Sequence, residues 1–203
     1  MPEIYQLNLP HPSNEFLQTI KDLVCNSLLD AAGKLWMDQQ NNVTNSALYS
    51  FFKDSVVDQL ISKEFGSFFH VPVSGVVGIM KNADSEHANH PPHIDSRRSL
   101  AINYYVELGG NTVATTFYDL AESTAPKQSQ NYTYQQVQDL RMGSVQFAQG
   151  SWYAYDVCRC HSIENITGTR CFVSILIDDP AFTVRDFRAQ YPKLISDKIQ
   201  LYK

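Results

Sequence analysis

The chain has 203 residues, of which 43% are hydrophobic and 18% are charged, a composition typical of a globular protein rather than a disordered one. Its formal net charge of −5 argues against the broad basic surface of a duplex-DNA-binding protein, so we do not expect a nucleic-acid partner, although single-stranded or nucleotide-sized substrates stay open. Apolar runs such as Val71–Met80 are shorter than the roughly 20 residues of a membrane-spanning helix, which excludes that kind of anchor.

The N-terminal segment predicts no secretory signal. Met1–Pro10 has neither the basic start nor the apolar stretch of a signal peptide. We therefore expect a cytoplasmic protein whose four cysteines are reduced thiols rather than a disulfide framework.

The first 70 residues predict two helices. Ser13 or Asn14 is suited to cap the first, and apolar residues then recur at helical spacing from Phe16 to Leu28. The second is expected to begin near Ser46. Its expected inner face comprises Leu48, Phe52, Val56 and Leu60.

After about residue 70 the pattern changes to short segments rich in β-branched and aromatic residues, separated by glycine and polar clusters. The predicted strands are Val73–Met80, Leu100–Glu107, Val113–Tyr118, Ser144–Phe147, Trp152–Asp156 and Cys171–Ile177. Many short strands after a helical start predict a mostly β fold, a barrel or sandwich with flanking α-helices. We expect one domain over residues 1–203, with its β core at about 71–180.

Two further segments are predicted around this core. The polar, Gln-rich stretch Ala121–Asp139 is expected to be an irregular insertion or a mobile loop, and it is a candidate lid. A final helix is expected over Val184–Ile199, with an interruption at Pro192.

The sharpest chemical signal is His93-Ile94-Asp95. Side chains alternate along a strand, so positions 93 and 95 point the same way and offer an imidazole and a carboxylate to one metal ion. Non-haem iron(II) oxygenases use two histidines and one carboxylate on one face of the metal. The best candidate for the second histidine is His161, which we expect a turn over residues 156–160 to deliver.

Arg170 follows His161 by nine positions and is expected to face the barrel interior. Its guanidinium could grip a carboxylate with two parallel hydrogen bonds and would stay charged when buried. An iron site with such an arginine beside it suits a chelating dicarboxylate cosubstrate.

This order of residues resembles the iron(II)/2-oxoglutarate-dependent oxygenases. The segment from His93 to Val106, with its Tyr104-Tyr105 pair, is most similar to the prolyl-hydroxylase-like branch, as is Gly150–Asp156 before His161. The resemblance covers about residues 73–178. It implies a double-stranded β-helix, that is, a jelly-roll, cupin-like barrel with N-terminal helices.

The resemblance also implies a set of roles and a reaction. His93, Asp95 and His161 would bind Fe(II), while Arg170 and Tyr105 would bind the distal carboxylate of 2-oxoglutarate. Dioxygen would be consumed, with succinate and CO2 released and an aliphatic C–H bond of an amino acid, peptidyl side chain or small metabolite hydroxylated. Asp95 favours hydroxylation, because halogenating members lack this carboxylate. The small polar residue that the family often has two places after the arginine is Phe172 here.

Several residues have both a functional and a structural interpretation. Arg97 and Arg98 could bind an anionic substrate or lie exposed in a turn, and Asn103 could line the pocket or be a buried, satisfied amide. Trp152 could be a substrate platform, although a core aromatic is the commoner case.

His87 and His90 could contact substrate or metal, but we favour a polar loop at the barrel rim. Cys158 and Cys160 beside His161 could suggest zinc, yet a second short ligand pair is missing, and small buried cysteines are the better interpretation.

Two other functions remain open from the sequence. One is a cupin-like iron or manganese enzyme that does not use 2-oxoglutarate, in which Arg170 would serve the substrate. The other is a non-catalytic barrel that binds a metal or ligand, although the complete set of His93, Asp95, His161 and Arg170 argues against it.

Overall fold

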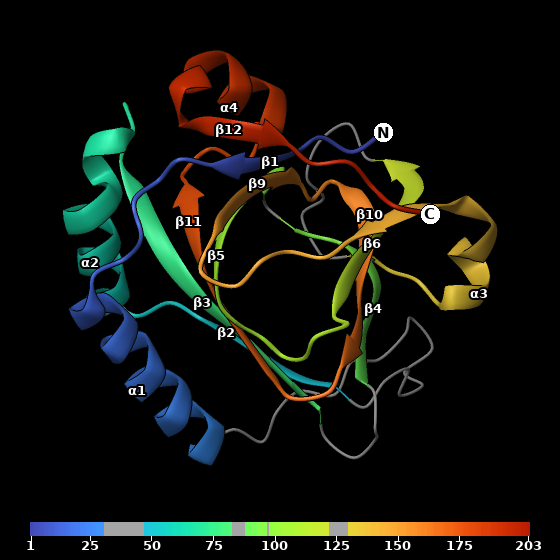
Figure 1. Ribbon diagram of the computed structural model, residues 1–203, viewed down its shortest axis with the longest axis horizontal. Coiled ribbons are helices and arrows are strands. Elements are labelled where there is room, and N and C mark those ends of the chain that lie inside the picture. Colours follow the sequence, from blue (N-terminus) through green and yellow to red (C-terminus); the bar gives the residue numbers. More distant parts are fainter. Residues whose placement is uncertain (31–46, 83–87, 97, 122–129) are drawn as a thin grey trace.

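The computed structural model describes residues 1–30, 47–82, 88–96, 98–121 and 130–203. Two antiparallel sheets face each other and enclose a barrel (Figure 1). The seven-stranded major sheet has, in spatial order, β12 (Ile195–Lys198), β1 (Ile4–Leu7), β9 (Trp152–Asp156), β5 (Leu100–Leu108), β11 (Thr169–Ile177), β3 (Val73–Asn82) and β2 (Ala47–Phe52). The five-stranded minor sheet has β7 (Gln130–Asn131), β4 (Ala88–Ile94), β10 (Arg159–Ile166), β6 (Ala114–Ala121) and β8 (Arg141–Val145). The predicted mostly β jelly-roll, a double-stranded β-helix with flanking helices, is confirmed.

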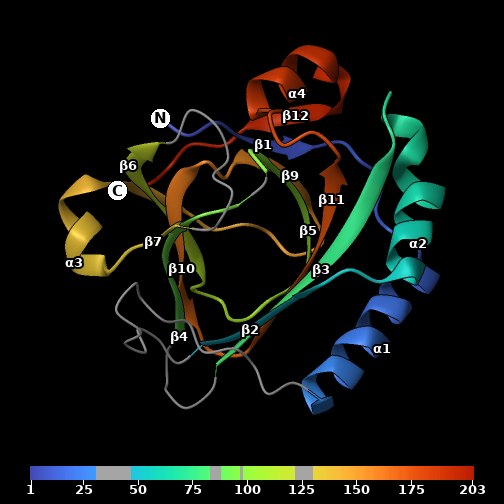
Figure 2. The ribbon, with the colours of Figure 1, turned by 180° about the vertical axis from the view of Figure 1, so that it is seen from behind.

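The helices lie on the outside of the barrel, with α1 and α2 together on one flank (Figure 2). They are α1 (Asn14–Asp30), α2 (Ser55–Phe65), α3 (Tyr134–Val137) and α4 (Val184–Gln190). Short 3-10 turns follow at Gly66–Phe68, Gln138–Leu140 and Pro192–Leu194. Within the described part of the chain, no helix is both long and apolar enough to span a bilayer.

Alternation along each strand divides the apolar residues between two main cores. On β5, Tyr104 packs outward with the helices, while Tyr105 packs inward among the aromatic residues that fill the barrel. The inward aromatics contact one another closely; the Tyr105 and Phe147 rings, for example, are stacked with centroids 4.9 Å apart. Both faces of the major sheet are therefore buried, one under helices and one inside the barrel.

Phe65 anchors the helix-facing core. Its fully buried ring makes edge contacts with Phe16 on α1 and Trp152 on β9, at centroid distances of 5.9 and 4.9 Å. Phe65→Ala should lower the free energy of unfolding by about 3–5 kcal/mol, because it leaves a cavity where three elements meet. Urea denaturation measures this, and Val56→Ala on the exposed side of α2 should change it by less than about 0.5 kcal/mol.

The prediction of a helix beginning near Ser46 is wrong. Residues Ala47–Phe52 form β2, which pairs with the edge of β3, and α2 begins only at Ser55. Asp54 caps that helix by accepting a 2.7 Å hydrogen bond from the Val56 amide. The inner face is consequently shifted: Leu60 is buried as expected, but Val56 is 46% exposed.

Two expectations for the C-terminal third also need correction. His161 is not delivered by a long turn but lies inside β10, whose pairing with β4 and β6 places it in the minor sheet. The final helix ends at Gln190, because the Pro192 ring cannot continue it, and residues Ile195–Lys198 form β12 instead.

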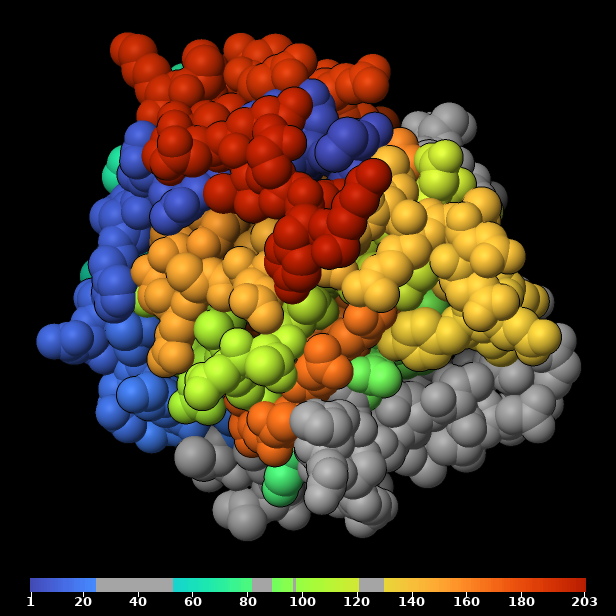
Figure 3. All heavy atoms as spheres, turned by 45° about the vertical axis from the view of Figure 1, so that its right-hand side comes forward, coloured from blue at the N-terminus to red at the C-terminus, as the bar shows by residue number. Residues whose placement is uncertain are grey.

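The last residues of the chain join the two sheets at one side of the barrel. The Ile199 amide donates to the Ile4 carbonyl of β1, and Tyr202 exchanges two backbone hydrogen bonds with Ser144 of β8. In Figure 3 this red C-terminal segment runs across the face of the molecule. It therefore connects the β1 side of the major sheet to the β8 edge of the minor sheet.

The predicted insertion Ala121–Asp139 is partly regular. Residues 122–129 lie outside the described part of the chain, so the lid interpretation stays a prediction there. The rest contains β7, which pairs with β4 at His93 and Asn131, and α3, whose first turn is closed by a capping box between Thr133 and Gln136. This half of the segment thus forms a wall beside His93.

Candidate metal centre

Three side chains that can bind a metal converge where β4 and β10 pair. His93 on β4 lies opposite His161 on β10, and Asp95 follows immediately after the end of β4. One ligand atom from each residue lies within 4.8 Å of the other two. Alternation places His93 and Asp95 side by side, and the pairing of β10 with β4 brings His161 to them; His93 and His161 are 4% exposed.

Both imidazoles are oriented by backbone carbonyls. The Nδ1 atom of His93 lies 2.8 Å from the Pro91 carbonyl oxygen, and that of His161 lies 3.0 Å from the Arg159 carbonyl oxygen. Because a carbonyl only accepts, each Nδ1 carries a hydrogen, so the lone pair of each ring in its neutral form is on Nε2. Burial, followed by the proximity of His93, lowers the pKa of His161 to about 4, so this ring is neutral, the form that binds metals.

Asp95 is ionised and held from one side. Burial is the largest single influence and opposes its charge, but the Arg98 guanidinium together with His93 and His161 outweighs it, so the pKa of Asp95 lies well below its usual range. Arg98 places Nε at 2.8 Å and Nη2 at 2.6 Å from the same oxygen, Oδ2. The other oxygen, Oδ1, faces Nε2 of His93 at 3.4 Å.

The three potential ligand atoms form a compact set. With hydrogens on both Nδ1 atoms, the Nε2 atoms of neutral His93 and His161 are available to a metal, and one ligand atom of each of the three residues lies within 4.8 Å of the other two. Two imidazoles and one carboxylate at this spacing could all bind one cation. Two histidines and one carboxylate on one side of a metal leave its other positions open, as non-haem iron(II) chemistry requires. The donor set therefore fits Fe(II).

Arg170 is buried in the barrel, and its charge acts on His90, whose ring lies beside that of His93. It is 2% exposed, and its guanidinium carbon lies 4.6 Å above the centre of the Tyr105 ring. Its Nη1 makes only a long 3.5 Å contact with the Leu108 carbonyl, and its buried Nε has no partner among the described residues. A buried cation without an acidic partner in the described chain is costly, so this position is suited to bind an anion.

The structure brings Tyr105 and Arg170 together, and the contact between them is a cation–π contact. The Tyr105 ring lies under the guanidinium, while its hydroxyl lies 3.1 Å from the Tyr155 hydroxyl. Burial, followed by the proximity of Tyr105, holds the pKa of Tyr155 well above its usual value, so this phenol stays neutral. Sequence reasoning missed Tyr155, although its alternation with Ala154 on β9 was a usable signal.

A chain of hydrogen bonds connects these groups across the major sheet. Arg98 Nη1 donates to Ser174 Oγ at 3.0 Å, and Ser174 Oγ donates to Asn103 Oδ1 at 2.6 Å. Asn103 Nδ2 then donates to the Tyr155 hydroxyl at 2.7 Å, which reaches Tyr105. Asn103 therefore lies inside the barrel with its amide satisfied by neighbouring residues, and its role toward a substrate stays a prediction.

His90 is the main residue whose position was misjudged. It does not lie on a polar rim but is 2% exposed on β4, with its ring 4.3 Å from that of His93. His93 pairs with His161 and His90 pairs with Ile163, so three residues along β4 match two along β10. This β-bulge turns His90 and His93 to the same face of the strand. The prolines at 91 and 92 occupy this bulge, where the missing amide hydrogens cost no ladder bonds.

The remaining candidates separate clearly. Arg97 and His87 lie outside the described residues. Trp152 lies in the helix-facing core, and its Nε1 donates to the Pro10 carbonyl at 3.0 Å. This position fits the packing interpretation and lies outside the proposed site. Cys158 and Cys160 are buried thiols that form no disulfide, and Cys158 Sγ donates to the Arg98 carbonyl at 3.8 Å. Neither belongs to the cluster of His93, Asp95 and His161.

Comparison with known proteins gives matches in structure but not in sequence. No family model and no curated protein sequence matches the chain. A prolyl hydroxylase from Trichoplax adhaerens, solved with a peptide fragment of the hypoxia inducible factor oxygen degradation domain, is similar over 85% of this chain and 81% of its own, with 12% identity and a TM-score of 0.49. A Pseudomonas putida prolyl-4-hydroxylase is similar over 85% and 90%, with 10% identity and a TM-score of 0.45.

A third similar structure is the epimerase SnoN in complex with Fe3+, alpha ketoglutarate and nogalamycin RO. It covers 98% of this chain and 89% of its own, with 11% identity and a TM-score of 0.46. Prolyl hydroxylases are thus among the structures that the chain resembles, as the sequence resemblance predicts. Because each of these TM-scores lies below 0.5, the roles of the residues rest on this chain's own geometry.

Proposed function

We propose that the chain is an Fe(II)/2-oxoglutarate-dependent dioxygenase. The observation that carries this function is a pairing of two features inside one barrel. One ligand atom each of His93, Asp95 and His161 lies within 4.8 Å of the other two, and the same barrel holds the buried Arg170, which has no acidic partner in the described chain. The first feature suits a divalent metal, and the second suits the distal carboxylate of a chelating dicarboxylate.

Each residue has a defined task in this function. His93 and His161 would hold Fe(II) through Nε2, and Asp95 would hold it through Oδ1. The bound iron would supply the coupling of dioxygen reduction to the oxidative decarboxylation of 2-oxoglutarate. Arg170 would bind the distal carboxylate, and the Tyr105 ring would support the guanidinium from below. The surrounding aromatic residues would exclude water and strengthen these electrostatic contacts.

The substrate is proposed by chemical class only. An intact Asp95 supports hydroxylation of an aliphatic C–H bond, in an amino acid, a peptidyl side chain or a small metabolite. Asn103 lies on the inner face of β5, where it would position the pocket wall through its bonds to Ser174 and Tyr155.

The decisive experiment uses the purified protein without oxygen. Adding Fe(II) and then 2-oxoglutarate should produce the weak visible charge-transfer band of a keto acid chelated to iron. Glutarate has both carboxylates but lacks the keto oxygen, so it should give no band. Admitting O2 should release succinate even without the primary substrate, at a low uncoupled rate.

The outcomes separate the alternative functions. Iron binding without a band or succinate would indicate a metal enzyme of another kind, with Arg170 serving the substrate. A band with neither succinate nor any consumption of O2 would indicate a ligand-binding barrel. Failure to bind iron would contradict the proposed function altogether.

A further inference from the structure

We propose that Arg98 is a positioning residue that makes Asp95 a one-oxygen ligand. This inference rests on the proposed function and deepens it, because it assigns a further residue to the same site. Two nitrogens of Arg98 contact Oδ2 of Asp95 at 2.8 and 2.6 Å, while Oδ1 is directed toward Nε2 of His93. The two carboxylate oxygens therefore have different tasks.

The contacts of Arg98 occupy Oδ2 of Asp95. A carboxylate oxygen offers about two lone-pair sites; here Nε of Arg98 donates a hydrogen bond to Oδ2, and Nη2 of the same guanidinium lies against that oxygen at 2.6 Å in an ion pair. A metal among the three ligand atoms is thus left with Oδ1 of Asp95. If Oδ2 were free, the carboxylate could rotate and bind through both oxygens, filling a position that the cosubstrate or O2 needs.

Arg98 is itself held from the major sheet. Its Nη1 donates to Ser174 on β11, and Ser174 is fixed by the buried amide of Asn103 on β5. The Asp95 backbone is anchored separately, by donation of its amide to the Val157 carbonyl at 3.2 Å. The orientation of the carboxylate is therefore set by β5, β11 and the turn between β9 and β10, and not only by the strand that precedes it.

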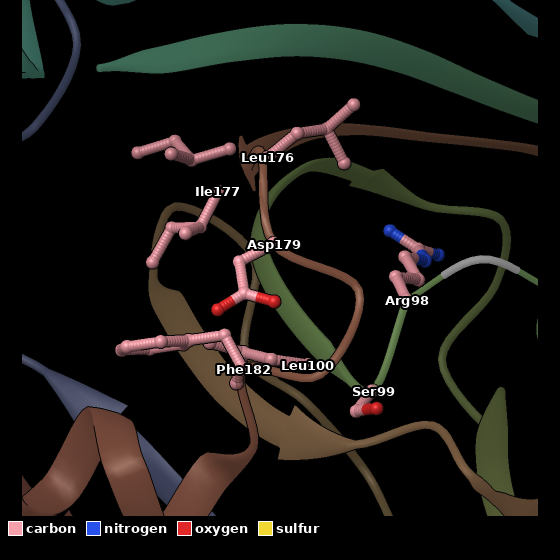
Figure 4. Close-up of a pocket in the computed structure, with 8 residues that line it drawn as sticks. Arg98, Ser99, Leu100, Leu176, Ile177, Asp179 and Phe182 are labelled. Atoms are coloured by element: carbon pink, nitrogen blue, oxygen red, sulfur yellow. The ribbon is translucent and has the colours of Figure 1, made fainter. Parts of the chain in front are cut away.

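The other acidic group near Arg98 does not compete for it. Arg98 lines a small pocket with Ser99, Leu100, Asp179 and Phe182 at the ends of β5 and β11. In Figure 4 the Asp179 carboxylate points toward Phe182 and Leu100, and the guanidinium lies on the opposite side. Asp179 accepts the Ala181 amide at 2.9 Å instead. The guanidinium therefore contacts Asp95 and Ser174 rather than Asp179.

The test uses Co(II) as a spectroscopic probe in the intact protein. In Arg98→Gln, the visible spectrum of the cobalt-loaded protein should change before any cosubstrate is added, because Asp95 then binds through both oxygens. Titration with 2-oxoglutarate should show an affinity weaker by about tenfold or more, a typical cost of removing a residue that orients a metal ligand. Cobalt affinity should fall by less than this.

Two further variants separate positioning from charge. Arg98→Lys keeps the positive charge but has a single nitrogen, so it should remain impaired. Ser174→Ala keeps the ion pair but removes its support, and should give a smaller change of the same kind. Arg188→Gln removes a comparable pair with Glu3 outside the barrel, and should match the wild type.

Three results would overturn the inference. They are a wild-type cobalt spectrum and cosubstrate affinity in Arg98→Gln, full recovery of both in Arg98→Lys, or complete loss of cobalt binding in a folded Arg98→Gln protein. The last would mean that Arg98 is needed for ligation itself. If the wild-type protein binds no cobalt, the proposed function fails instead, which is a distinct result.

Discussion

An alanine at position 93 should leave the barrel folded but abolish its binding of Fe(II) and Co(II). His93 contributes one of three convergent ligand atoms, and Asp95 and His161 cannot complete the face alone. Isothermal titration with Co(II) should show no binding in His93→Ala. The visible band with Fe(II) and 2-oxoglutarate should also be absent, while circular dichroism should remain that of the wild type.

A second histidine variant provides the control. His70 lies outside the barrel, where its ring stacks on Tyr191 with centroids 5.4 Å apart. His70→Ala should therefore bind metal as the wild type does. Retention of the band in His93→Ala would show that the metal lies elsewhere, and the assignment of all three ligands would have to be abandoned.

Replacing Arg170 with methionine should raise the concentration of 2-oxoglutarate needed for binding by a large factor. Methionine keeps an unbranched apolar stem over Tyr105 but removes the guanidinium. Leaving a carboxylate without its charged partner in a buried site costs about 2–5 kcal/mol, which corresponds to roughly a 30-fold or greater loss of affinity. Titration of the charge-transfer band at a fixed iron concentration measures this loss.

Thermal unfolding gives the same variant a second readout. The guanidinium has no acidic partner in the described chain, so its removal should not lower the melting temperature of the unliganded protein. The rise in melting temperature that 2-oxoglutarate causes should disappear. Arg188→Met, which breaks a pair with Glu3 outside the barrel, should retain that rise. Unchanged cosubstrate affinity in Arg170→Met would refute the assignment of Arg170.

The strands that could be predicted are those whose side chains alternate between two apolar environments. The segments from Leu100 and from Cys171 were recognisable because both faces of β5 and β11 are buried and rich in β-branched and aromatic residues. By contrast, β10 carries Arg159, His161 and Glu164, so its composition resembles a polar turn. Its strand character comes from pairing with β4 and β6, which composition does not encode.

Pairing between distant segments explains the other errors. Residues Ala47–Phe52 become a strand because the edge of β3 is available, not because their own pattern excludes a helix. Likewise, β12 and β1 pair across almost the whole chain, with Tyr5 opposite Lys198. The secondary structure of such segments is poorly predicted from local propensity, because the strand that stabilises them is remote in sequence.

In the candidate site, too, some features follow from the local sequence and others depend on tertiary structure. The side-by-side placement of His93 and Asp95 follows from strand alternation and could be predicted. The burial of His90 could not, because it depends on a bulge that reverses alternation. The contacts of Arg98 also depend on a side chain crossing to Asp95 and Ser174, for which the sequence offers two equally plausible arginines.

The two halves of the site belong to different sheets. The histidines lie on β4 and β10 of the minor sheet, whereas Arg170, Tyr105 and Asn103 lie on β11 and β5 of the major sheet. Under the proposed function, a bound metal alone would brace only one wall of the barrel. A dicarboxylate that reaches from the metal to Arg170 would connect the two sheets. The cosubstrate should therefore reduce slow motions of one sheet relative to the other far more than the metal alone does.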